Sequence, residues 1–188
     1  MVSASADSAE IISGDRAMNE ARLRTFAAAC LVLGALLGMA GTFVPTPELR
    51  GLAWGIDGTL LVVASALLAT HHLRRGDELL AAGFLVFLAG ETLIVSGSAM
   101  ELVASAPVFA AGAALWAAGM ALVSASSFMP GFVRAAGAVG ALLLLVTAVQ
   151  IFCGVDLDPL TRPLPFFAYP FLAATLFGWA WAHVRTMR

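Results

Sequence analysis

Six apolar runs, each about twenty residues long, alternate with short polar segments between Thr25 and His183. A helix needs roughly twenty apolar residues to cross ~30 Å of hydrocarbon, because each residue adds ~1.5 Å. The pattern therefore predicts an all-α integral membrane protein, a compact bundle of six transmembrane helices joined by short loops. The predicted spans cover residues 25–44, 51–70, 79–98, 106–128, 132–153 and 164–183.

Proline and glycine mark the ends of several runs. Pro45-Thr46-Pro47 closes the first run, and Met129-Pro130-Gly131 separates the fourth from the fifth. Pro107 is expected in the first turn of the fourth helix, where proline is tolerated. Residues 1–22 are rich in Ser, Asp and Glu, so we expect a disordered cytoplasmic N-terminal segment followed by a six-helix membrane domain over residues 23–188.

The arginines are distributed unequally between the two ends of the predicted bundle. Eight lie on one side, whereas Arg50 and Arg162 lie on the other side. Because positively charged loops stay in the cytoplasm, this distribution places both termini there. The eight are Arg16, Arg22, Arg24, Arg74, Arg75, Arg134, Arg185 and Arg188.

The composition agrees with a membrane location and indicates the kind of genome that encodes the chain. Apolar residues make up 61% of the chain and charged residues only 12%, about half the charge of an average soluble domain. The net charge of −2 gives no reason to expect a nucleic-acid partner. Lysine is absent and Ala and Gly are abundant, which is typical of a high-GC bacterial genome and suggests the inner membrane.

Small residues recur at spacings that let helices approach closely. Gly34 and Gly38 form one GxxxG pattern, and Gly51 and Gly55 form another. Such faces stabilise contacts within a bundle, and they leave open a homo-oligomer or a membrane-protein partner besides the lipid bilayer. The same packing is expected around Gly112, Gly119, Gly137 and Gly140.

Asp57 and Glu91 are the only acidic residues within the predicted spans. Both lie ~9–11 Å below the predicted outer boundary on neighbouring helices. Gln150 and Tyr169 lie in the same outer half, so the four residues Asp57, Glu91, Gln150 and Tyr169 predict a polar pocket. Ionisable groups at such depth face a bundle interior or water, and two adjacent carboxyls are expected to share one proton.

A purely structural interpretation stands beside this one. Asp57 is shallow enough to reach the interface, and a protonated Glu91 could hydrogen-bond across helices. Tyr169 would then belong to an outer aromatic belt with Phe166 and Phe167. Pro170 is expected to kink the sixth helix in either case.

Cys30 and Cys153 are expected near opposite membrane faces, too far apart for a disulfide. The three histidines, His71, His72 and His183, fall at the cytoplasmic edge, where interfacial placement is favoured over haem or metal ligation because no carboxylate or thiol joins them at ligand spacing. Trp179 and Trp181 are expected in an inner aromatic belt.

The chain lacks the residue patterns of several classes of membrane enzyme. No serine is predicted beside a membrane-embedded histidine, and no CxxC or phosphate-binding glycine loop occurs. We therefore expect a non-enzymatic accessory, assembly or stress-related bundle, without a cofactor or metal. The alternative is a small proton- or cation-coupled carrier or channel that uses an outward-facing pocket at Asp57 and Glu91.

Overall fold

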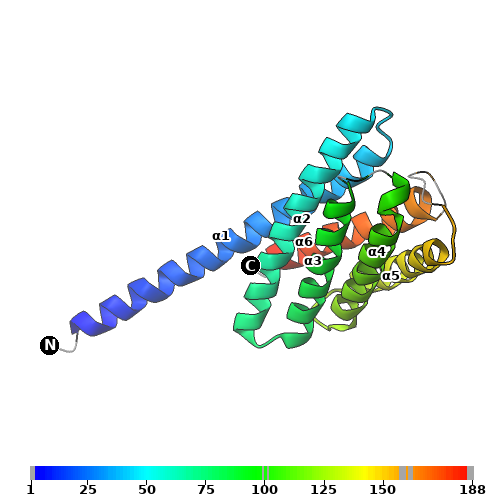
Figure 1. The fold of residues 1–188 in the computed structure, drawn as a ribbon. Coiled ribbons are helices and arrows are strands. Elements are labelled where there is room, and N and C mark those ends of the chain that lie inside the picture. Colours follow the sequence, from blue (N-terminus) through cyan, green and yellow to red (C-terminus); the bar gives the residue numbers. More distant parts are fainter. Residues whose placement is uncertain (1–2, 99, 101, 157–159, 161–162, 186–188) are drawn as a thin grey trace.

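The structure is a computed structural model that describes residues 3–98, 100, 102–156, 160 and 163–185. The described residues form helices and connecting turns, with no strand among them (Figure 1). In chain order the elements are α1 (Ser3–Thr42), α2 (Pro47–Arg75), α3 (Glu78–Ser98), α4 (Leu102–Ala125), α5 (Gly131–Phe152), the π-helical segment η1 (Leu164–Ala168) and α6 (Tyr169–Arg185).

Five helices, α1 to α5, are long and apolar enough to cross a membrane. The chain therefore has the helices of a multi-pass membrane protein, as the sequence predicts. Three of them, α1, α2 and α4, begin several residues or more before the predicted apolar runs. α2 begins at Pro47, where the fixed φ suits a first helical turn, and it continues through the basic segment to Arg75. α4 begins at Leu102, so Pro107 lies inside the helix and not in its first turn.

The sixth predicted span is divided in the structure. Residues 164–168 form a π-helical turn, and α6 itself has 17 residues. The amide of Ala168 donates to the Pro163 carbonyl at 2.9 Å, a spacing of five residues along the chain. Pro170, the second residue of α6, has no amide to donate, so the irregular turn precedes it. The sequence predicts that Pro170 kinks the sixth helix. The structure has a π-helical turn directly before α6 instead.

α1 begins at Ser3 and so includes residues 3–22 of the segment that the sequence predicts to be disordered. This segment has one glycine, no proline and several alanines, so nothing in it stops a helix that is already nucleated by the apolar run. The first half of α1 extends away from the bundle (Figure 1).

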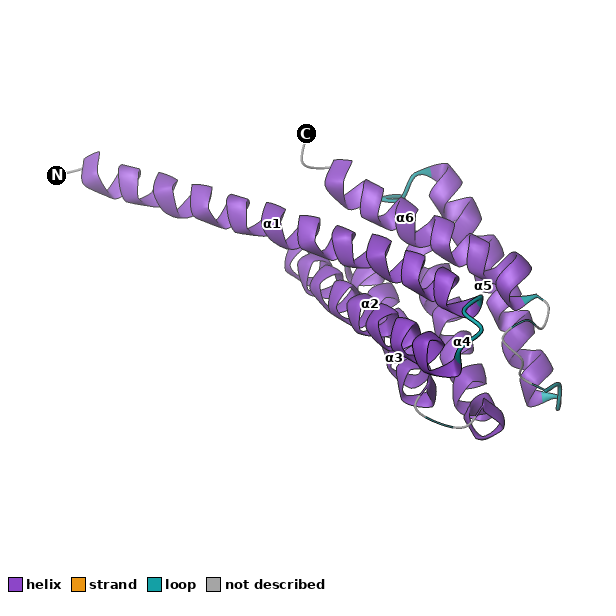
Figure 2. Ribbon diagram, turned by 90° about the horizontal axis from the view of Figure 1, so that it is seen from above, coloured by secondary structure: helices purple, strands orange, loops and turns teal. Residues whose placement is uncertain are grey.

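The beginning of α1 and the end of α6 lie toward the same end of the bundle (Figures 1 and 2). The α2–α3 and α4–α5 connections lie at this end too, and the α1–α2 connection lies at the other. α6 packs mainly against α1 and α5. This arrangement is the one expected of antiparallel neighbours joined by short loops.

Glycines allow the backbones of α3 and α4 to approach closely. A Cβ on Gly90 would lie 2.8 Å from the Gly112 carbonyl, and a Cβ on Gly119 would lie 2.7 Å from the Phe87 amide. The predicted role of the α4 glycines as a packing face is therefore confirmed. Gly51 and Gly55 differ, because a Cβ added at either position would meet nothing within 4 Å. This second GxxxG pattern makes no close helix contact within the described part of the chain.

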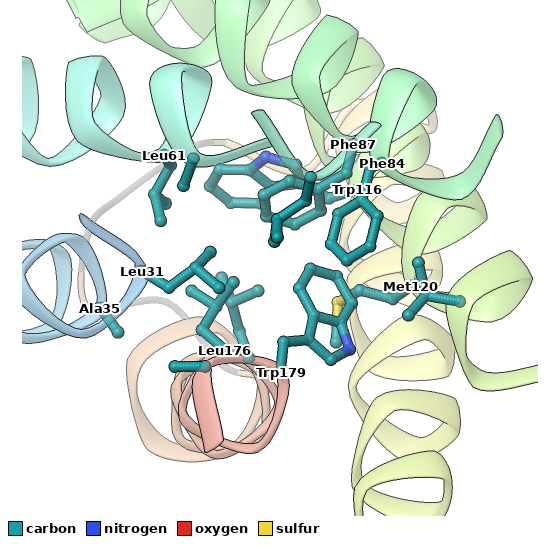
Figure 3. Close-up of a cluster of buried hydrophobic side chains, with 14 of the residues drawn as sticks. Leu31, Ala35, Leu61, Phe84, Phe87, Trp116, Met120, Leu176 and Trp179 are labelled. Atoms are coloured by element: carbon teal, nitrogen blue, oxygen red, sulfur yellow. The ribbon is translucent and has the colours of Figure 1, made fainter. Parts of the chain in front are cut away.

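The centre of the bundle is an aromatic core (Figure 3). Phe87 stacks on Trp116 with ring centroids 5.9 Å apart, and Phe84 meets the Trp179 ring edge-on at 5.1 Å. Trp179 is 0% exposed, whereas Trp181 is 43% exposed, so the predicted pairing of these two residues in an aromatic belt is wrong for Trp179. Residues two apart on a helix point in very different directions, which explains the difference.

The two cysteines are free, as predicted: Cys30 is buried and Cys153 is exposed.

Candidate functional site

A cavity of about 520 Å³ opens near the end of the bundle that carries the α1–α2 connection. Residues from α1, α2, α3, α4, η1 and α6 line it, and α5 contributes none. Its walls are mostly apolar and aromatic. The polar or aromatic residues that line it include Arg50, Trp54, Asp57, Ser98, Ser105, Phe109, Trp116 and Tyr169.

Asp57 faces this cavity from α2, and its carboxyl packs against the glycine face of α1. A Cβ on Gly38 would lie 2.5 Å from Asp57 Oδ2, and one on Gly34 would lie 3.2 Å from Oδ1. Asp57 Oδ1 is buried without a hydrogen-bond partner. The first GxxxG pattern therefore makes room for a carboxyl as well as bringing two helices together.

Glu91 lies behind Asp57 and is 1% exposed. A Cβ on Gly58, the residue after Asp57, would lie 2.9 Å from Glu91 Oε1. Glu91 therefore packs against α2 beside Asp57, close enough for the two carboxyls to influence each other electrostatically. The Trp116 indole also interacts with the Glu91 carboxyl. No hydrogen bond of standard geometry forms, because Glu91 Oε2 and Trp116 Nε1 are both buried without a partner.

Tyr169 joins the two acidic residues. It follows η1 directly, lines the cavity and interacts electrostatically with both carboxylates. Phe166 and Phe167 are half exposed, at 51% and 50%. The π turn therefore separates Tyr169 from the two phenylalanines with which the alternative interpretation grouped it. Insertions of this kind often re-aim side chains at functional sites.

Gln150 does not belong to this group. It lies on α5, is half buried and is absent from the cavity wall. The sequence pattern groups Gln150 with the other three residues because all four lie at a similar predicted depth. Depth along a helix does not determine which side of the helix a residue occupies. The structure thus brings together Asp57, Glu91 and Tyr169, with Trp116 as an addition that sequence reasoning missed.

A second polar cluster lies at the opposite end of the bundle, near the α2–α3 connection and the end of α6. His72 Nε2 lies 2.9 Å from His183 Nε2, and both side chains are fully buried. His72 Nδ1 lies 3.2 Å from Asp77 Oδ2, and His183 Nδ1 lies 2.6 Å from the Trp179 carbonyl oxygen. His72 and His183 are thus buried at one end of the bundle and have specific partners, which the sequence did not predict.

A glycine turn positions the carboxylate of this cluster. Gly76 has φ 75°, in the left-handed region that glycine adopts without strain. The Gly76 amide donates to Leu73, and the Asp77 amide donates to the His72 carbonyl at 2.9 Å. The chain thereby reverses at once, and the Asp77 side chain returns to the His72 ring.

This histidine pair could not be found from spacing alone, because 111 residues separate its members. The available signal was local: His72 stands five residues before Asp77 across a helix-ending glycine. Within the described residues, no group of three or more His, Cys, Asp or Glu side chains is placed to hold a metal ion.

None of the protein-family models, curated proteins or solved structures compared with this chain matches it.

Proposed function

We propose that this protein is a non-enzymatic inner-membrane protein whose acidic cavity binds an organic cation in competition with a proton. The proposal includes six spans, with η1 and α6 together forming the sixth, and both termini in the cytoplasm. The eight-to-two distribution of arginines supports this orientation. The cavity then opens toward the outer side, where the α1–α2 connection lies.

One observation carries the proposal: Asp57 lines a cavity, and a second, fully buried carboxyl, that of Glu91, is close enough to interact with it electrostatically. Neither Asp57 nor Glu91 has an ion pair in the described part of the chain. Arg50 is the basic residue on the cavity wall, and its guanidinium lies 5.7 Å from the centre of the Trp54 ring. A proton or a bound cation would relieve the repulsion between the two carboxyls.

The cavity walls indicate which cation would fit. Its volume lies within the range of roughly 300–1,000 Å³ that is typical of small-molecule sites. Trp54, Phe109, Trp116 and Tyr169 supply aromatic surface, which attracts organic cations, whereas a small hydrated metal ion would need more oxygen ligands. The ligand class is therefore a cation carrying apolar groups.

Tetraphenylphosphonium tests this proposal with the purified protein in lipid nanodiscs. We expect saturable binding that weakens as the pH falls and releases a proton into weakly buffered solution. Asp57→Asn should abolish proton release and weaken binding at least tenfold. Gln150→Ala is the matched control, because Gln150 lies outside the cavity, and it should bind like the wild type. Absence of binding, or equal binding of the neutral triphenylphosphine oxide, would contradict the proposal.

The second candidate function is the accessory role expected from the sequence, in which the bundle contacts another membrane protein. The observation that favours it is an alanine-lined groove between α4 and α5, formed by Ala114, Ala117, Ala118, Ala121, Ala135, Ala138 and Ala141 among others. Glu91→Gln separates the two functions. Loss of cation binding at normal membrane abundance supports the cavity, whereas unchanged phenotype at lowered abundance supports the accessory role.

A further inference from the structure

We propose that His72 and His183 hold one proton between their Nε2 atoms, with Asp77 as the counter-charge, and that this cluster is a pH-sensitive clamp between α2 and α6. The proposal concerns the end of the bundle remote from the acidic cavity. It does not depend on cation binding there.

The hydrogen-bond geometry fixes the number of protons. Three contacts are present: Asp77 to His72, His72 to His183, and His183 to the Trp179 carbonyl. Each contact needs one proton. A carbonyl oxygen only accepts, so His183 Nδ1 must carry a proton. The central contact needs a second proton on either Nε2 atom, and the contact with Asp77 needs a third.

Two neutral imidazoles and an ionised Asp77 supply only two protons. One contact would then place two lone pairs against each other, and the 2.9 Å Nε2–Nε2 distance leaves no room for a water between them. The third proton converts one imidazole, formally His72, to an imidazolium. It pairs with the Asp77 carboxylate, and the cluster as a whole is then electrically neutral.

The surroundings agree with a positive ring at this position. His72 stacks on Phe84 with ring centroids 5.7 Å apart and an interplanar angle of 10°. Phe128 meets the His72 ring at 5.3 Å and the His183 ring at 5.3 Å. The faces of aromatic rings carry partial negative charge, which favours a cation beside them. The two phenylalanines also keep water away from the shared proton.

The other charged groups near the cluster oppose the extra proton in part. Arg24 from α1 and His71 from α2 act electrostatically on His183, and Arg75 acts on His72. Arg75 Nε also lies 4.0 Å from Asp77 Oδ2, where it competes for the carboxylate. Glu20 acts on His71 in the opposite sense. Burial of the two rings opposes the proton as well. The Asp77 carboxylate is the group that favours it, through its direct contact with His72.

Loss of the proton has a mechanical consequence. α6 packs mainly against α1 and α5, and the imidazole pair is a hydrogen bond between α6 and α2 among the described residues. Raising the pH would remove one of the three contacts and loosen that junction. At ~1.5 Å per residue, His72 lies about 22 Å from Asp57 along α2. The apolar side chains of Phe84, Phe87 and Trp179 are buried in the core of the bundle (Figure 3).

Nuclear magnetic resonance of the full chain, labelled with ¹⁵N-histidine in nanodiscs, tests the proton count directly. At about pH 7.5, where a free histidine is mostly neutral, we expect one doubly protonated ring and a scalar coupling between the two Nε2 atoms. His71→Gln should leave both signals unchanged. The proposal is overturned if both rings are singly protonated without coupling, or if elemental analysis finds a stoichiometric metal whose removal abolishes the link.

Asp77→Asn supplies a second test that does not require disrupting the pair. An asparagine amide can donate to His72 Nδ1, so the three contacts are satisfied by two neutral imidazoles. We expect this variant to keep the Nε2–Nε2 coupling, to lose the doubly protonated ring and to give spectra independent of pH. Glu78→Gln, an exposed change of the same kind one residue later, should behave like the wild type. A doubly protonated ring that persists in Asp77→Asn would overturn the role of Asp77.

Discussion

Gly38 on α1 and Asp57 on α2 face each other so closely that a methyl group on Gly38 would lie 2.5 Å from the Asp57 carboxyl. The absence of a side chain at Gly38 leaves the space that the Asp57 carboxyl occupies. Gly38, which has no functional group, is therefore part of the cavity wall.

Gly38→Ala should therefore move the Asp57 carboxyl and weaken binding of tetraphenylphosphonium several-fold. Gly55→Ala is the control, because a side chain there meets nothing within 4 Å. Both substitutions remove a helical glycine, which by itself favours helix by about 0.5–1 kcal/mol. Isothermal titration of the two variants in nanodiscs measures the difference. Equal affinities would mean that Asp57 adjusts without consequence and that the α1 contact is only structural.

Glu91 should carry a proton, alone or shared with Asp57, at neutral pH, because it is 1% exposed and has no cationic partner in the described part of the chain. Infrared difference spectra should show a protonated-carboxyl band that disappears in Glu91→Gln. The fold should tolerate Glu91→Gln far better than Glu91→Lys, since an amide keeps most of the hydrogen-bonding capacity of a carboxylic acid. Normal accumulation of Glu91→Lys, together with no band, would show that Glu91 faces water.

The orientation is open to a direct chemical test. In a background with Cys30→Ala and Cys153→Ala, Thr46→Cys and Val155→Cys should react with an impermeant thiol reagent on intact cells. Glu78→Cys should react only after permeabilisation, because it lies at the start of α3, at the end of the bundle assigned to the cytoplasm. All three residues are exposed. Labelling of Glu78→Cys from outside would reverse the proposed orientation and place the histidine clamp on the outer face.

Particular residues show which features of the structure could be predicted from the sequence and which could not. The ends of α3 and α5 were predicted within about a residue, because an apolar run bounded by polar residues defines a span in one dimension. Gln150 and Trp179 were misassigned for a common reason. Each was grouped by depth, yet function and burial depend on which side of the helix a residue takes, and that is set by packing in three dimensions. The His72–His183 pair could not be predicted from local sequence, because only the complete fold brings these two residues together.

The contrast between Trp179 and Trp181 gives a test of the core. Trp179 contacts Phe84 and Phe87 and is fully buried, so Trp179→Ala should destabilise the bundle by about 3–5 kcal/mol through the cavity it leaves. Trp181→Ala removes the same side chain from a half-exposed site, where lipid replaces the lost contacts, and should cost much less. Thermal unfolding in one detergent compares the two variants. Equal losses would contradict the packing of α6 described above.

The histidine clamp predicts how stability depends on pH. If the folded cluster holds one proton more than the unfolded chain near neutral pH, the free energy of unfolding falls as pH rises until that proton is lost. Asp57 and Glu91 act in the same sense when they are protonated in the fold, so the wild type alone cannot isolate the clamp. The decisive quantity is the difference between the wild type and Asp77→Asn, in which the acidic pair is unchanged.

Apparent unfolding midpoints measured between about pH 6 and about pH 9, a range that spans the ordinary titration of histidine, should therefore depend on pH differently in the two proteins. The wild-type midpoint should fall steeply as the pH rises. The midpoint of Asp77→Asn should fall less, and we assign its remaining pH dependence to Asp57 and Glu91. Adding Glu91→Gln to Asp77→Asn should flatten the remainder further. Parallel curves for the wild type and Asp77→Asn would show that the histidine pair takes up no proton on folding.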